Sequence, residues 1–187
     1  MNNSKVVALP LRLLHWSMAL LIFSMLAIGL TMVTSLANYN LLVSIHRPLG
    51  ILILLLALMR LVVRLTKGVP SMPSDMPVWQ KGLAHASHWV LYVLILLLPI
   101  VGWAMLSAAA YPIILFGSVE LPPIAPHNIA LFSILRSLHT ILAYSLFCVV
   151  LVHACAALVH GLIFKDGVLQ SMLRGGEEHA SVDSANR

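Results

Sequence analysis

The sequence predicts an all-α integral membrane protein, a bundle of four membrane-spanning helices with both termini in the cytoplasm. Of its 187 residues, 60% are hydrophobic and 9% are charged, and the mean hydropathy is +0.98. A soluble domain is nearer half apolar and a quarter charged, so this composition is typical of a membrane protein. The apolar residues are gathered in four stretches, each long enough to cross a hydrocarbon core of about 30 Å.

The first two spans are expected over residues 11–34 and 41–65, joined by a brief loop. His15 lies one turn inside the first span, deeper than a residue that only caps the helix would need to be. His46 lies near the start of the second span. Gly50 follows it by four residues, which leaves room on the same helix face for a flat ring to approach the backbone.

Residues 66–82 are Pro-rich, which makes a regular element unfavourable there and predicts a linker. The third span is expected over residues 83–107 and the last over residues 136–164. The connection of residues 108–134 is apolar for a loop, so it is expected either as a lid over an outer cofactor or as a re-entrant turn at the surface. Residues 174–187 form a polar tail that is expected to be disordered in the cytoplasm.

The basic residues predict the orientation. Nine of the eleven lysines and arginines fall on one side of the four spans, and the positive-inside rule assigns that side to the cytoplasm. These nine are Lys5, Arg12, Arg60, Arg64, Lys67, Lys81, Lys165, Arg174 and Arg187. The net charge of +5 therefore reports orientation and contact with anionic lipid, and it does not indicate binding to nucleic acid.

Two histidines of the last span suggest a cofactor. His139 and His153 are fourteen residues apart, an interval that returns to within about 40° of the same helix face, about 21 Å further along the axis. Both imidazoles would then face one bundle interior. Ionisable side chains in membrane helices are costly and usually functional, and imidazole is a common ligand of haem iron.

The other spans supply partners for these two histidines. With four alternating spans, His46 and His139 lie at the outer level of the membrane, and His15 and His153 lie at the inner level. Each level then has one histidine from the first two spans and one from the last. This is the ligand set for two six-coordinate haems that serve electron transfer.

Two further histidines remain alternatives for the inner ligands. His88, at the start of the third span, is the stronger alternative and would replace His15. It could equally bind a quinone carbonyl or relay the proton that quinone reduction requires. His160 is the weaker one, because it would separate the two irons by about 31 Å of helix rise, more than the hydrocarbon core.

Three arginines lie beside the predicted ligands. Arg47 directly follows the second-span histidine, whereas Arg136 and Arg12 each precede a predicted ligand by three residues, which is one helical turn. Their guanidinium groups could reach haem propionates, or they could be simple interfacial anchors. The propionate role is favoured for Arg47 and Arg136, because these two depart from the positive-inside pattern.

Several motifs together resemble the bacterial cytochrome b561 family of small four-helix dihaem membrane proteins, over nearly the whole chain to about Leu173. The matching pieces are Leu14-His15-Trp16, His46 with Gly50, Gly82-Leu83-Ala84-His85-Ala86-Ser87-His88, Ser137-Leu138-His139, Leu151-Val152-His153-Ala154 and Phe164-Lys165-Asp166-Gly167. Singly these motifs are weak, but as a set they are specific. The resemblance implies a domain over residues 1–173 with two b haems, His15 and His153 holding the inner iron and His46 and His139 the outer one.

The resemblance also implies electron exchange with the quinone pool of the bacterial inner membrane. Some members look like superoxide:ubiquinone oxidoreductases, in which periplasmic superoxide gives its electron to the outer haem and ubiquinone is the final acceptor. The alternatives are a cytochrome b anchor subunit, which passes electrons from a soluble dehydrogenase or hydrogenase to quinone, and a haem-free bundle with histidines in a proton path. The short tail and modest outer loops favour a protein that acts alone.

Overall fold

The computed structural model describes residues 9–67, 77–115 and 117–173. Within these residues, four helices are long and apolar enough to cross a membrane, which confirms the predicted four-helix membrane protein. They are α1 (Leu9–Thr34), α2 (Tyr39–Lys67), α3 (Val78–Ala108) and α4 (Ile129–Val159).

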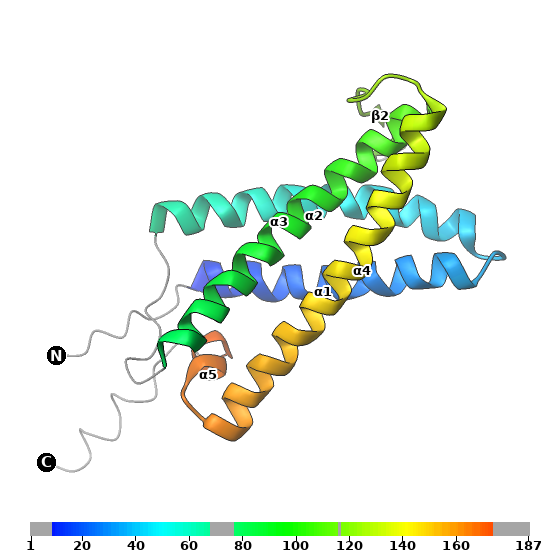
Figure 1. Cartoon of the computed structure of the whole chain (residues 1–187). Helices are drawn as coiled ribbons and strands as arrows, with labels where there is room; N and C mark the ends of the chain where they lie inside the picture. Colours follow the sequence, from blue (N-terminus) through cyan, green and yellow to red (C-terminus); the bar gives the residue numbers. More distant parts are fainter. Residues whose placement is uncertain (1–8, 68–76, 116, 174–187) are drawn as a thin grey trace, which may run out of the picture.

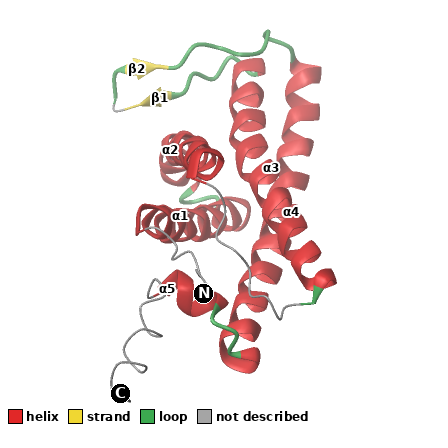
Figure 2. Ribbon diagram, turned by 90° about the vertical axis from the view of Figure 1, so that its left-hand side faces the viewer, coloured by secondary structure: helices red, strands yellow, loops and turns green. Residues whose placement is uncertain are grey.

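The helices form two antiparallel hairpins, α1 with α2 and α3 with α4, and α2 packs against α3. Figure 1 shows that the two hairpins cross obliquely, and Figure 2 shows α1 and α2 end-on beside α3 and α4. The start of α1 and the end of α2 lie at the same end of the bundle as the start of α3 and the end of α4 (Figure 1). Side chains near the start of α1 can therefore meet side chains near the end of α4.

The buried core is a narrow seam to which all four helices contribute. Its members are Met18 and Ile22 from α1, Ile53 and Ala57 from α2, Leu94 and Ile95 from α3, and Leu146 from α4. Many large apolar side chains on the outward faces are exposed, for example Leu20, Leu55 and Val152. Such a surface suits helices whose outer faces meet lipid chains, which are as apolar as the side chains themselves.

Helix α4 begins at Ile129, seven residues before the start expected from hydropathy. The reason is a cap: the side chain of Asn128 accepts a hydrogen bond from the backbone N–H of Leu131 at 2.9 Å. Helix α3 likewise begins at Val78, directly after Pro77, so the linker expected over residues 66–82 is shorter. Its central part, residues 68–76, lies outside the described residues.

The connection between α3 and α4 contains a small antiparallel hairpin of β1 (Ile114–Leu115) and β2 (Val119–Glu120). The indole N–H of Trp103 donates to the carbonyl of Pro122 at 3.0 Å, and the hydroxyl of Ser107 accepts from the backbone N–H of Ile124 at 3.1 Å. These bonds fix the connection to the end of α3. The hairpin projects from that end of the α3–α4 pair (Figure 2).

The other end of α4 reverses direction. The helix widens into a π-helical turn, η1 (His160–Phe164), and the backbone turns at Lys165 (φ 52°) and Gly167 (φ 81°). The short helix α5 (Val168–Leu173) follows and folds back beneath the bundle (Figure 1). The tail expected to be disordered, residues 174–187, lies outside the described residues.

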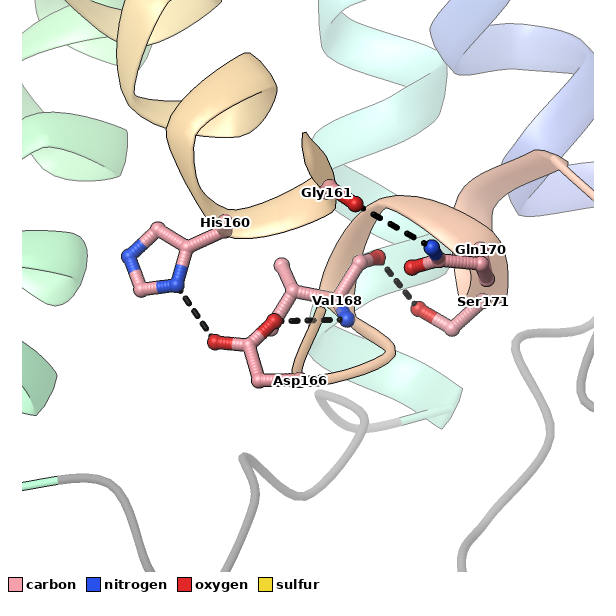
Figure 3. Close-up of polar contacts among 6 residues, drawn as sticks. All are labelled: His160, Gly161, Asp166, Val168, Gln170 and Ser171. Atoms are coloured by element: carbon pink, nitrogen blue, oxygen red, sulfur yellow. Dashed lines mark hydrogen bonds and ion pairs between the residues drawn. The ribbon is translucent and has the colours of Figure 1, made fainter. Parts of the chain in front are cut away.

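Polar contacts hold this reversal in place (Figure 3). Asp166 accepts from the backbone N–H of Val168 at 3.2 Å and pairs with Nδ1 of His160 at 2.5 Å. A Cβ on Gly161 would overlap the side chain of Leu169, so the absence of a side chain there allows η1 and α5 to pack. The turn between α4 and α5 is therefore an ordered structure.

Candidate functional site

Two pairs of histidines face each other inside the bundle at two levels. His15 of α1 lies opposite His153 of α4, with 6.4 Å between the ring centroids. His46 of α2 lies opposite His139 of α4, with 6.3 Å between the centroids. These are called the α1–α4 pair and the α2–α4 pair below. The structure thus brings together both pairs expected from the sequence, and α4 contributes one ring to each.

The separation within each pair suits a metal ion bound between the two rings. With a metal–nitrogen distance of about 2.0–2.1 Å and about 1.1 Å from a ring nitrogen to its centroid, two imidazoles on opposite sides of one metal have centroids about 6.2–6.4 Å apart. Both pairs match this value. His88 also lies near His153, but their centroids are only 5.5 Å apart, which is too close for the two rings to bind one ion from opposite sides.

Three of the four paired rings contain a buried nitrogen without a partner. The Nδ1 atoms of His15, His46 and His139 have no hydrogen bond to any described residue. A buried polar atom without a partner costs free energy, and such atoms are uncommon in native proteins. No cluster of three or more His, Cys, Asp or Glu side chains among the described residues could hold a metal ion. The donor set is therefore two imidazoles at each level, which suits a haem iron whose other four ligands come from the porphyrin.

A glycine on α3 makes room for the α2–α4 pair. A Cβ on Gly102 would lie 3.1 Å from Cε1 and 3.3 Å from Nδ1 of His139, closer than ordinary contacts allow. Because Gly102 has no side chain, α3 can approach this ring without displacing it. Gly102 was not assigned to the site from the sequence. A Cβ on Gly50 would meet only Cε of Met25, at an ordinary 3.7 Å.

Cationic and aromatic side chains surround the α1–α4 pair. The guanidinium carbons of Arg60 and Arg64, on α2, lie 5.9 and 5.3 Å from the ring centroid of Tyr92 on α3. Tyr92 is buried and lies one turn after His88 on the same helix. None of these three residues was assigned to the site from the sequence.

The three arginines expected near propionates differ in their surroundings. Arg47 is half-buried beside His46, and Arg136 is exposed; neither has an ion-pair partner among the described residues. Arg12 donates from Nε to the carbonyl of Met172 at 3.3 Å and from Nη2 to the carbonyl of Leu173. Its side chain therefore anchors the end of α5. The propionate role of these arginines stays a prediction.

The alternative ligand His160 lies at the start of the π-helical turn η1. Its Nδ1 atom is paired with Asp166 within the turn that follows α4 (Figure 3). The indole of Trp16 donates to the carbonyl of Met172 at 3.0 Å, alongside the arginine contact, so α5 closes this end of the bundle against α1. His153, on α4, precedes His160 by seven residues, so the α1–α4 pair lies further inside the bundle than His160.

Four apolar helices with facing imidazoles at two membrane levels define a class of protein, the membrane-embedded b-type cytochromes, whose helices hold haem between such rings. A family model described as prokaryotic cytochrome b561 matches residues 6–175. The chain belongs to this family. It is therefore a multi-pass bacterial membrane protein that transfers electrons with haem b.

Curated relatives agree with this assignment. The chain is 38% identical over 132 residues to a probable superoxide oxidase CybB of Yersinia pestis, covering 69% of this chain and 73% of the relative. It is 31% identical over 163 residues to cytochrome b561 homolog 2 of Escherichia coli (strain K12), covering 85% of this chain and 86% of the relative. Cytochrome b561 homolog 1 of the same bacterium is 28% identical over 137 residues, covering 73% and 77%.

Proposed function

We propose that the chain binds two haem b groups, one within each histidine pair, and that it transfers electrons between them and the quinone pool. The observation that supports this most directly is the separation of the ring centroids, 6.4 Å in one pair and 6.3 Å in the other. Both values agree with the spacing of two imidazoles that share one metal ion. His15 and His153 hold one group, and His46 and His139 hold the other.

Helix α4 links the two levels. His139 and His153 project from it fourteen residues apart, which corresponds to about 21 Å of helix rise. When bound, each haem supplies a one-electron redox centre with no open iron position. The protein keeps the two centres at fixed depths, because each ring comes from a long helix and not from a loop.

Superoxide and ubiquinone are the substrates that we propose. The relative from Yersinia pestis named a probable superoxide oxidase supports this choice. Two superoxide anions each lose one electron and leave as dioxygen, and the two electrons with two protons convert ubiquinone to ubiquinol. Arg47 and Arg136, beside the α2–α4 pair, would attract the anion. His88, beside the other pair, is positioned to move a proton.

We also propose an orientation in the bacterial inner membrane with both termini in the cytoplasm. The positive-inside rule supports it, because most basic residues of the described part of the chain lie at the end of the bundle where α1 begins. The α2–α4 pair then lies nearer the periplasm, where extracellular superoxide would arrive. The ends of the chain themselves lie outside the described residues.

The test is a haem count with ligand variants. Purified protein in detergent is expected to contain two b haems per chain by pyridine haemochrome assay. His139→Ala should remove the haem of the α2–α4 pair and His153→Ala the other, leaving one haem with a different reduced-minus-oxidised spectrum in each variant. His127→Ala, an exposed loop histidine, is the control and should retain both. Two haems in both ligand variants would refute the assignment.

The substrates are tested separately on protein with intact haem. Rapid mixing with superoxide should reduce the haems, and ubiquinone should then reoxidise them. The haems could stay oxidised after mixing with superoxide while the protein still exchanges electrons with quinol. That result would refute the superoxide step and leave the dihaem assignment standing.

A further inference from the structure

A cluster of cations near the end of α2 has no acidic partner among the described residues. Arg60 and Arg64, on successive turns of α2, both lie against the ring of Tyr92. Among the described residues, the acidic side chains are Glu120, in the hairpin at the other end of α3, and Asp166, which is paired with His160. Neither belongs to this cluster. Two guanidinium groups that share one ring repel each other unless an anion neutralises them.

The position of Arg60 relates this cluster to the cofactor site. It follows His46 by fourteen residues on α2, the interval that separates His139 from His153 on α4. Arg60 therefore projects to nearly the same face of α2 as His46, but at the level of the α1–α4 pair. It is half-buried. A charged side chain at such a depth faces a functional interior and needs a partner.

We propose that Arg60 and Arg64 hold the propionate carboxylates of the haem bound by the α1–α4 pair, with Tyr92 as the platform beneath both guanidinium groups. This inference rests on the proposed binding of a haem at that pair. Arginine is suited to the role, because its planar fork donates two parallel hydrogen bonds to one carboxylate and its face stacks on aromatic rings. Arg64 lies one turn nearer the end of α2 and would hold the carboxylate closer to the membrane surface.

The alternative anion is a lipid phosphate at the membrane surface. Arg60 lies seven residues before the end of α2, about 10 Å from it by helix rise, and it shares the level of the α1–α4 pair. The geometry therefore favours an anion that belongs to the bound cofactor. The two sources differ in their dependence on lipid composition, which the test uses.

The experiment measures the midpoint potential of each haem in the purified protein, in dodecyl maltoside, a detergent that contains no phosphate. The spectra of the His139→Ala and His153→Ala variants assign the two haems. Arg60→Gln should favour the oxidised form of the haem at the α1–α4 pair by about tenfold, which is 59 mV for a one-electron couple. The other haem should keep its potential. The resonance Raman propionate bending bands should shift as well, because the carboxylate loses its partner.

Three comparisons make the test specific. Arg60→Lys retains the charge and should restore most of the potential, which a purely structural role would not predict. Arg64→Gln provides a second measurement if Arg60→Gln does not accumulate. Lys165→Gln removes a charge from an exposed position at the same end of the bundle and should leave both potentials unchanged.

The outcomes separate this inference from the proposed function. Protein without two haems refutes the proposed function before any potential is compared. Two haems with an unchanged potential in both glutamine variants, or an equal shift of both haems, overturns the propionate assignment alone. A shift that occurs only when phospholipid is added identifies a lipid phosphate site and also overturns it.

Discussion

Substitution of Gly102 by alanine tests how tightly the protein positions one of the proposed ligands. The new methyl group would lie 3.1 Å from Cε1 and 3.3 Å from Nδ1 of His139. Ordinary contacts between such atoms are several tenths of an ångström longer. Either the imidazole or helix α3 must therefore move by that amount, and ligand geometry has a tolerance of about 0.5 Å.

Two opposing contributions set the size of the effect. Added volume in a packed interior costs about 1–3 kcal/mol. Alanine in place of glycine within a helix returns about 1 kcal/mol. Overall stability should therefore fall by only about 0–2 kcal/mol, so the variant is expected to fold. Haem binding at the α2–α4 pair, which bears the displacement directly, should weaken by about 1–2 kcal/mol, roughly fivefold to thirtyfold in Kd.

The assay is the rate of haem transfer from the purified variant to an excess of apomyoglobin, followed together with the reduced-minus-oxidised spectrum. Loss of the haem at the α2–α4 pair should accelerate, while the haem at the other pair should behave as in the wild type. Gly29→Ala is the matched control, because a Cβ at that helical position meets nothing within 4 Å. Identical haem loss and spectra in Gly102→Ala and wild type would refute the steric argument.

Three further predictions concern His88, the ring planes of the two pairs and helix α5. His88→Ala should retain both haems in the haemochrome assay, because its 5.5 Å separation from His153 is too short for coaxial ligation; loss of one haem would make it a ligand. The ring planes cross at 75° and 66° within the two pairs, so both ferric centres should give strongly anisotropic low-spin EPR signals, and signals of small anisotropy would contradict the crossed planes. Arg12→Gln removes charged donors from the end of α5 and should raise the rate of amide hydrogen exchange over residues 168–173 about tenfold or more, since such bonds contribute about 1.5–3 kcal/mol. Unchanged exchange rates would show that α5 is held by other contacts.

The sequence predicts the membrane fold and the meeting of the histidines because both depend on simple geometry. Four apolar stretches of sufficient length fix four spans, and alternation of the spans fixes the depth of each histidine. A fourteen-residue interval on α4 then places His139 and His153 on one face at two depths. The choice between His15 and His88 could not be made this way, because both lie at the same depth. It depends on how the hairpins cross, which the ring separations of 6.4 and 5.5 Å reflect.

Other features depend on contacts that periodicity does not encode. The spacing leaves Arg12 either as a propionate partner or as an interfacial anchor, and it does not show that the reversal at Lys165 and Gly167 brings the carbonyl of Met172 within its reach. The earlier start of α4 depends on the cap formed by Asn128. Hydropathy marks where a helix becomes apolar, whereas a cap determines where it begins, and the two positions differ here by two turns.

Arg60 could have been found from spacing alone, and its position explains an asymmetry between the two levels. Helix α4 places a histidine at each level, whereas α2 places His46 at one and, fourteen residues later, Arg60 at the other. The second histidine at that level comes instead from α1. On α2, the level of the α1–α4 pair therefore has a guanidinium where the other level has a histidine. A fixed positive charge disfavours the ferric state of a neighbouring haem. If Arg60 is only partly neutralised by a carboxylate, the haem at this level should be the easier of the two to reduce, and electrons entering at the α2–α4 pair would flow towards the end of the bundle where α1 begins.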